Sequence, residues 1–235
     1  MEQTFPPRMF GLVGGLGVGA GIFYYKALVD AHLARGLSPR LLMVHADVRR
    51  VLAMATAREA QQLAECLAGL LQQLALGGAE VASVPAFAPQ VCARQLADIS
   101  PLPLISLVDA IVSEVKRLLC RRVALFGARV TMETRMFGSL EGVDVVMPKA
   151  DELDTIAGIY GRVVEEGRAS MEDREVLSSL AHALIDRERL DNIILAGTDF
   201  AFVFNPENTS FPYLDGARIH IEAITREIAP QSASA

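Results

Sequence analysis

The sequence predicts an α/β protein in which two open, mostly parallel sheets form two pseudo-symmetric lobes that face a central cleft. Three observations support this fold class. Short apolar runs alternate along the chain with longer segments of helical period. Motifs at the ends of strands in the first half have counterparts in the second half. The 235 residues are 51% hydrophobic and 21% charged, which is typical of a globular protein with a sizeable core.

In the first half, apolar runs indicate buried strands at residues 9–13, 41–45, 81–85 and 102–106. Segments with the apolar spacing of helices lie at residues 19–34, 58–77, 91–99 and 107–119. Strands that alternate with helices imply right-handed crossovers between parallel strands. Helices then cover both faces of each sheet, so the strands are apolar throughout.

In the second half, strands are expected at residues 123–127, 143–147 and 192–196, and helices at 131–140, 152–166 and 171–188. A last helix is expected to begin near Ile219. The segment 11–15 resembles 124–128, and 84–86 resembles 195–197. Because the C-terminal segment is expected to return to the first half, we predict one lobe at residues 1–100 plus 212–235 and the other at 101–211. Open sheets bind ligands beyond the carboxyl ends of their strands, so both sets of loops would meet in one cleft.

Composition excludes several classes of protein. A net charge of −6 without a basic block argues against nucleic acid binding. Apolar stretches are shorter than the roughly 20 residues of a membrane span, and the first residues lack a signal peptide's apolar region, so we expect a cytoplasmic protein. Cys66, Cys92 and Cys120 have no zinc or redox spacing, and no cluster has the spacing of metal ligands, so no metal is expected.

Four motifs carry a family resemblance. They are the opening loop at residues 11–17, the loops at 84–90 and 194–200, and the closing segment at 215–223. In this order and spacing they resemble the aspartate/glutamate racemase family, and the resemblance covers almost the whole chain. In that family the two middle loops read roughly Pro-Cys-Asn-Thr and Gly-Cys-Thr-Glu. The cysteine positions are vacant in this chain, where Ala86 and Gly197 stand.

The vacancies exclude the family's mechanism. A cofactor-independent racemase removes a weakly acidic α-proton from one face and returns a proton to the other, and thiolates suit both tasks. Alanine and glycine move no protons, so the two-thiol mechanism is excluded, as is the single-thiol mechanism of the related arylmalonate decarboxylases. Cys92 lies six residues beyond Ala86, and a packing role is the better explanation for it.

Four residues remain as candidate proton carriers: His45, Asp47, Asp199 and His220. His45 ends a strand on the cleft side and is the first choice, because an imidazole titrates near neutrality. The resemblance places His220 in the closing motif and matches Asp199 to the glutamate of the second loop. Structural roles are equally open for these side chains, since strand ends often carry structural histidines.

Six residues are candidates for binding a small carboxylate ligand: Gly15, Arg49, Arg50, Phe87, Thr131 and Thr198. The resemblance matches both threonines to residues that hold the substrate carboxylate, although either can simply cap a helix. Arg49 and Arg50 follow the second strand, where the family often has an arginine for the distal carboxylate. Phe87 replaces a polar residue of the family and is either a cleft wall or a core aromatic.

The glycine-rich segment 14–19 also suggests a dinucleotide-binding loop. Its spacing matches only the relaxed form of the motif, and no acidic residue ends the second strand, so we expect no cofactor. In the racemase family this segment is a tight loop whose amides line the cleft.

Three functions stay open at this stage. The sequence favours a divergent enzyme that performs isomerase or lyase proton chemistry on a small carboxylic acid. The alternative is a pseudoenzyme that binds a small acid or a partner without turnover. A racemase with displaced bases is the third and least favoured reading. Since the family's members often dimerise, a homodimer is expected.

Overall fold

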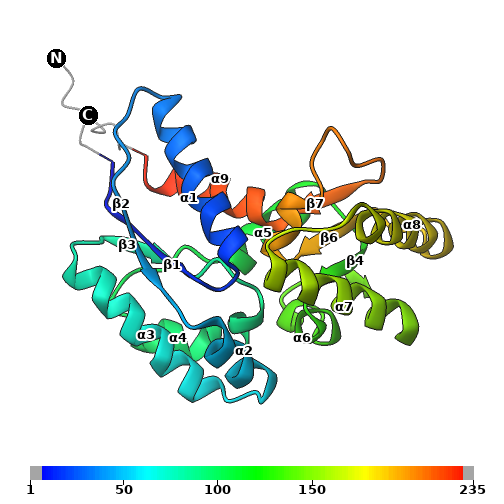
Figure 1. Ribbon diagram of the computed structural model, residues 1–235, viewed down its shortest axis with the longest axis horizontal. Helices are drawn as coiled ribbons and strands as arrows, with labels where there is room; N and C mark the ends of the chain where they lie inside the picture. The colour runs from blue at the N-terminus through cyan, green and yellow to red at the C-terminus, as the bar shows by residue number, and fades with distance from the viewer. Residues whose placement is uncertain (1–6, 230–235) are drawn as a thin grey trace.

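The computed structural model describes residues 7–229 and shows two α/β lobes side by side (Figure 1). The first sheet has the strand order β2-β1-β3, with β1 at Phe10–Gly14, β2 at Leu41–His45 and β3 at Val81–Ser83. The second sheet has the order β5-β4-β6-β7, with β4 at Arg122–Gly127, β5 at Asp144–Val146, β6 at Asn192–Ala196 and β7 at Tyr213–Asp215. Every strand pairing is parallel, which confirms the predicted fold class.

Helices cover both faces of the first sheet (Figure 1). On one face lie α1 (Val18–Leu33) and α9 (Gly216–Glu227); on the other lie α2 (Val48–Thr56), α3 (Ala60–Leu76) and α4 (Ala93–Ile99). Leu12 of β1 packs with Tyr24 and Ile221 on the first face, and Val13 packs with Leu67 on the second. Successive strand residues thus enter opposite cores, as period-2 geometry requires.

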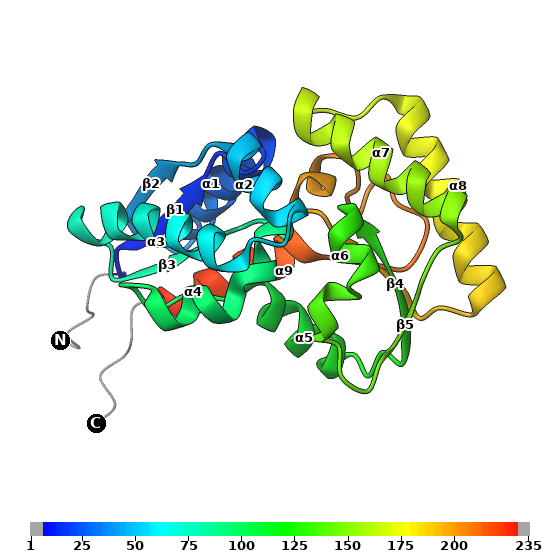
Figure 2. The same ribbon diagram turned by 90° about the horizontal axis from the view of Figure 1, so that it is seen from below.

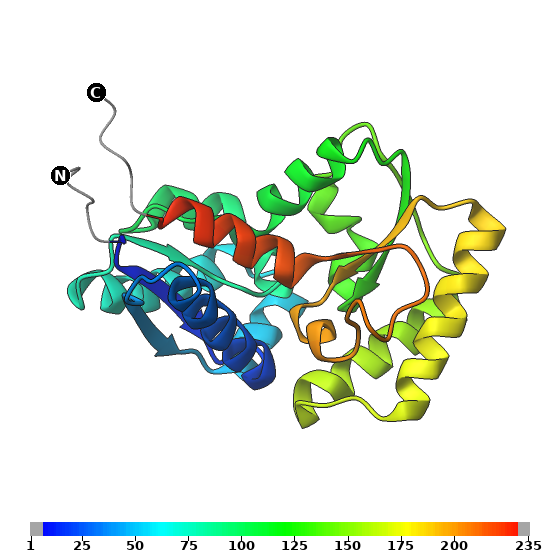
Figure 3. The ribbon, with the colours of Figure 1, turned by 90° about the horizontal axis from the view of Figure 1, so that it is seen from above.

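The second lobe has one continuous core, to which α5 (Leu107–Arg117), α7 (Ala150–Glu166) and α8 (Met171–Glu188) contribute. Figure 2 shows α7 and α8 with the short helix α6 (Arg129–Glu133) in this lobe, apart from α2, α3 and α4 of the first. Helix α9 starts directly after β7 and runs from the second lobe onto the first (Figure 3). The chain therefore crosses between the lobes again at its C-terminal helix.

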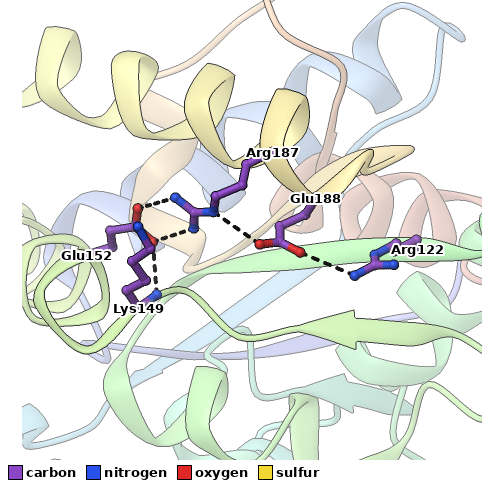
Figure 4. A network of polar contacts seen from close by, with 5 residues as sticks. All are labelled: Arg122, Lys149, Glu152, Arg187 and Glu188. Carbon is purple, nitrogen blue, oxygen red and sulfur yellow. Dashed lines mark hydrogen bonds and ion pairs between the residues drawn. The ribbon is translucent and has the colours of Figure 1, made fainter.

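A polar network ties α7 and α8 to the second sheet (Figure 4). The carboxylate of Glu152 accepts two hydrogen bonds from Arg187 (2.7 and 2.8 Å) and one from the backbone N–H of Lys149 (2.8 Å). Glu188 bridges Arg187 and Arg122, which begins β4. These contacts keep the pKa of Glu152 down at about 2. The network lies near the amino end of β4, away from the carboxyl-end loops.

Two predicted elements are wrong. The strand expected at residues 102–106 is reduced to one bridge between Leu104 and Ala82, because Pro101 and Pro103 have no N–H to donate. The helix expected at 131–140 ends as α6 at Glu133. The Thr134 hydroxyl accepts a hydrogen bond from the N–H of Phe137 (3.2 Å), and residues 135–137 adopt left-handed φ values of 51–59°. A 3₁₀ turn, η2 (Met136–Gly138), follows.

One α-helix and one strand were not predicted. Helix α2 begins at an N-cap, Asp47, and strand β7 has only three residues. The predicted lobe boundary at residue 212 stays a prediction, and β7, just beyond it, pairs with the second sheet. Within residues 7–229, no helix combines the length and apolarity needed to span a bilayer.

Candidate functional site

A cavity of about 180 Å³ lies between the lobes, beyond the carboxyl ends of β1, β3 and β4. The first lobe contributes Leu16, Val51 and Phe87 to its lining, and the second contributes Ala128 and Tyr160. Its wall is mostly apolar. The volume is below the roughly 300–1,000 Å³ of sites for drug-sized ligands, so the cavity suits only a small molecule.

The first vacant position opens directly onto this cavity. Ala86 lines it from the loop between β3 and the 3₁₀ helix η1 (Ala88–Cys92). Phe87 lines the cavity and is also part of the second lobe's core, where its ring packs on Gly216. Both readings of Phe87, cleft wall and core aromatic, therefore hold. Cys92 is fully buried behind the loop, and burial raises the pKa of its thiol to about 11, the opposite of an activated nucleophile.

The second vacant position is covered by another side chain. A Cβ atom on Gly197 would overlap the ring of Tyr160, which comes from α7 and lines the cavity. The φ of Gly197 is −150°, an extended conformation open to any residue, so the ring and not the backbone excludes a side chain. Tyr160 also packs on Phe200, with ring centroids 4.9 Å apart. Sequence reasoning missed Tyr160, whose only signal was the loss of a side chain at residue 197.

The second loop continues as the 3₁₀ helix η3 (Thr198–Phe202), in which Asp199 is completely buried. One carboxylate oxygen, Oδ1, accepts a hydrogen bond from the N–H of Ala20 in the first turn of α1 (3.1 Å). The other, Oδ2, is without a hydrogen-bond partner among the described residues. Burial raises the pKa of Asp199 to about 6, although the hydrogen bond from Ala20 and the nearby Tyr160 hydroxyl oppose that shift.

Two buried threonine hydroxyls also lack partners among residues 7–229. Thr131 lies in α6 after β4, and Thr198 opens η3 after β6. Because β4 and β6 are neighbours in the sheet, both hydroxyls lie at the same edge. The Tyr160 hydroxyl lies near Thr198 and Asp199, and burial raises the pKa of Tyr160 well above its usual range. Buried hydroxyls without partners are rare, so this edge has unused hydrogen-bonding capacity.

The remaining candidates of the first lobe lie outside the cavity. His45 and Asp47 are exposed at the end of β2, and the carboxylate of Asp47 accepts hydrogen bonds from the N–H groups of Arg49 and Arg50 as the N-cap of α2. Both arginine side chains are exposed. Gly15, with a φ of 81°, passes close beneath the ring of His45. The structure does not bring these residues together with Thr131 and Thr198.

His220 is buried within a hydrogen-bonded chain. Its Nε2 lies 3.1 Å from the carbonyl oxygen of Ile105 and 3.0 Å from the hydroxyl of Ser83, and its Nδ1 lies 2.9 Å from the hydroxyl of Tyr24. Since a carbonyl only accepts, Nε2 carries the hydrogen and Nδ1 accepts from Tyr24. Burial lowers the pKa of His220 to about 4. His220 is therefore neutral at pH 7 and joins α9 to α1 and β3.

A second cavity, of about 590 Å³, lies on the other side of the first loop, between α4 and α5. Arg94, Asp109 and Glu141 line it, and none of the predicted site residues does. In residues 7–229 no three His, Cys, Asp or Glu side chains gather closely enough to hold a metal ion. Of the predicted site residues, Ala86 and Phe87 line the cavity between the lobes, whereas Thr198 and Asp199 are buried next to Tyr160, which lines it.

The family profile described as Asp/Glu/Hydantoin racemase matches residues 13–224. The chain belongs to this family. No match was found among curated proteins. This match confirms the family resemblance that the four motifs indicated.

Solved structures share the fold over nearly the whole chain. An aspartate racemase homologue from Pyrococcus horikoshii OT3 is similar with a TM-score of 0.77 and 21% identity, covering 94% of this chain and 99% of that one. The aspartate racemase of Picrophilus torridus has a TM-score of 0.76 and 14% identity, covering 96% of each chain. The glutamate racemase of Thermus thermophilus, in complex with β-chloro-D-alanine, has a TM-score of 0.63 and 22% identity, covering 94% and 80%. At these identities the likeness concerns the fold alone.

Proposed function

We propose that this racemase-family protein binds a small carboxylic acid in the cleft between its lobes and does not racemise it. One observation carries the proposal: the cleft lacks opposed proton carriers at the two vacant positions. Ala86 has no acid/base group, and the ring of Tyr160 occupies the space of any side chain at Gly197. Racemisation needs a base on each face of the substrate, and this arrangement provides no thiol at either position and no room for one at Gly197.

The unpartnered hydroxyls support a carboxylate as the recognised group. Thr131 and Thr198 lie at the ends of adjacent strands, and the Tyr160 hydroxyl is close to Thr198. A carboxylate accepts several hydrogen bonds and can satisfy such donors together. The apolar wall formed by Leu16 and Phe87 would receive the hydrocarbon part of the acid. Arg49 and Arg50 are exposed, so their charges would act on the approach of the anion.

A second candidate is the divergent enzyme with one proton carrier. The observation that favours it is the pKa of Asp199, which burial raises to about 6, close to the value that suits a general acid at neutral pH. One such group can serve one face of a substrate, as in an isomerase or a lyase. It cannot serve two opposed faces. Asp199 would also have to leave its hydrogen bond with Ala20 to reach a ligand in the cavity.

A proton NMR time course in D2O distinguishes these functions. The panel contains both enantiomers of aspartate and glutamate, small hydroxy acids, malonates and maleate. Binding predicts line broadening of one acid without loss of its α-proton signal, and Thr198→Val, which keeps the side-chain shape, should weaken that binding about tenfold. Loss of an α-proton signal that Asp199→Asn abolishes would replace the proposal by the one-carrier enzyme. Two results would overturn the proposal of binding without racemisation: α-proton exchange that converts one enantiomer into both, or the absence of any line broadening and any turnover for the whole panel.

A further inference from the structure

The N-terminus of α1 is occupied by a carboxylate from the other lobe. Helix α1 has no acidic residue in its first turn, and its N-cap, Gly17, has no side chain to accept hydrogen bonds. Asp199 takes that role from η3, 179 residues along the chain, by accepting a hydrogen bond from Ala20 N–H at 3.1 Å. Negative charge is favourable at this end of a helix because unpaired N–H groups and the helix dipole point toward it.

The glycine-rich loop is shaped around this carboxylate. Gly17 has a φ of 138°, and a Cβ atom on it would lie 2.5 Å from Oδ2 of Asp199. Only glycine tolerates both that conformation and that approach. Oδ2 is fully buried and without a hydrogen-bond partner among the described residues, and it points at the loop. Glycine loops at helix N-termini hold anions in many proteins, and the anion held in this loop is the protein's own.

Neighbouring residues of η3 join the same contact. Ala201 is buried in the core formed by α1 and α9, and the ring of Phe202 packs edge-on against Phe23 with centroids 5.8 Å apart. The titratable side chains that face Asp199 are Tyr160 from α7 and Tyr24 from α1. Both are phenols whose pKa is raised by burial, so both are neutral and neither supplies a compensating charge.

We propose that Asp199 is a positioning residue that holds the second lobe to the glycine loop of the first and fills the anion site of that loop. We call this contact, between the Asp199 carboxylate and the N–H of Ala20, the latch. The latch lies beside the ligand cavity, because Leu16 of the loop and Tyr160, which adjoins Asp199, both line the cavity. The contact between Asp199 and Ala20 is therefore one of those that hold the two walls of the cleft together. The filled loop also leaves no room for the phosphates of a dinucleotide at the N-terminus of α1.

Chemical rescue tests the latch. The variant Asp199→Ala removes a carboxylate that formate can replace, so thermal unfolding is followed at pH 7 in about 100 mM formate and in equal chloride. Formate is expected to raise the Tm of the variant by roughly 3 °C more than chloride does, and to have a smaller effect on the unchanged protein, in which Asp199 already fills the site. Asp47→Ala is the matched control, because Asp47 caps α2 at an exposed site within its own lobe. No formate-specific shift beyond that of the unchanged protein is expected for it.

Hydrogen exchange at Ala20 supplies a second readout. The amide of Ala20 should lose at least about tenfold protection in Asp199→Ala and regain it in formate, whereas Asp199→Asn, which keeps an oxygen acceptor, should retain it. If Asp199→Ala does not fold, the Asn variant decides: lost protection there would overturn the latch. A folded Ala variant without formate rescue, or with unchanged protection, would overturn it as well. Hydrogen exchange at Ala20 in the absence of formate involves no ligand, so a failure of that readout would leave the proposed function standing.

Discussion

Gly197 and Tyr160 form a pair in which the small residue makes room for the large one. Restoring the family's thiol with Gly197→Cys is expected to destabilise the protein by about 1–3 kcal/mol, because the new Cβ overlaps the Tyr160 ring and forces it to move. Urea unfolding measures this loss. Ala86→Cys is the matched control: Ala86 already has a Cβ and faces the cavity, so we expect a cost below about 1 kcal/mol.

A double-mutant cycle isolates the cause. In the background of Tyr160→Ala the ring is absent, so Gly197→Cys should be nearly neutral there, with a coupling energy of about 1–3 kcal/mol between the two positions. An equal loss in both backgrounds would show that something other than Tyr160 excludes a side chain at residue 197.

The charge of Asp199 should appear in the pH dependence of stability. Its pKa lies near 3.8 in an unfolded chain and at about 6 in the folded protein, so the folded state holds the proton more tightly. This contribution to stability is therefore greatest below about pH 4 and is lost as pH rises toward 6, by up to about 3 kcal/mol. Asp199→Asn should remove this slope, which the difference between two urea-unfolding series from pH 4 to 7 measures. Parallel series would contradict the shifted pKa.

Helices α7 and α8 are joined to β4 by the network around Glu152. Glu152→Gln should cost about 2 kcal/mol in urea unfolding at pH 7, because a largely buried carboxylate loses its bidentate pairing with Arg187. The folded pKa of about 2 lies below the usual 4.5, so the stabilisation is present above pH 4.5 and is lost as pH falls toward 2.

The neighbouring Glu188 provides the comparison for this network. Its side chain is 28% exposed and makes single contacts with two partly exposed arginines, so Glu188→Gln should cost less than about 1 kcal/mol. Since the network lies away from the cleft, neither substitution should change binding of a small acid. Equal costs for the two variants would show that burial of Glu152 does not strengthen its pairing.

Elements with a strong local pattern were the ones that the sequence predicted correctly. The run at residues 192–196 is apolar and buried, and β6 has those bounds. Strand β7 was not predicted, because three residues are too few to show the apolar pattern of a strand. Helix α2 had one local signal that was not used, the N-cap Asp47, which was read as a candidate proton carrier.

The candidate site was predictable only where neighbours in sequence form it. Ala86 and Phe87 were recognised in the cleft loop and do line the cavity. Two other features of the site join residues that are far apart in the chain. The ring of Tyr160 covers Gly197, and the N–H of Ala20 donates a hydrogen bond to Asp199. Such contacts depend on how the two lobes pack, and no local periodicity encodes that.

On the scale of the whole molecule, one face of α1 is unusually apolar for a surface. Val18, Ile22, Tyr25 and Leu33 are 59%, 63%, 52% and 60% exposed, and their spacing places them along one side of the helix. Clustered apolar exposure of this kind marks an interaction site. The charges among them, on Lys26 and Asp30, pair with each other, so the face is neutral although the chain carries −6.

We propose that the homodimer expected from the family resemblance forms through this face of α1. Two copies that meet there would bury the apolar stripe of each without bringing net charges together. Beside α1, β2 is an edge strand with Met43 43% exposed, which extends the apolar surface. Sedimentation velocity should therefore show a dimer, and Ile22→Glu should weaken it at least about 100-fold, because each dimer would bury two unpaired charges.

Val176→Glu is the control for this prediction, because Val176 is an exposed apolar residue on α8, in the second lobe. It should leave the dimer unchanged. A monomer at about 100 μM would contradict the prediction, and so would a dimer that tolerates Ile22→Glu. The face begins at Val18, next to the glycine loop that contacts Asp199. A second copy bound there would therefore also stabilise the contact between Asp199 and Ala20. Hydrogen exchange at Ala20 should then slow as the protein concentration rises through the dimer Kd.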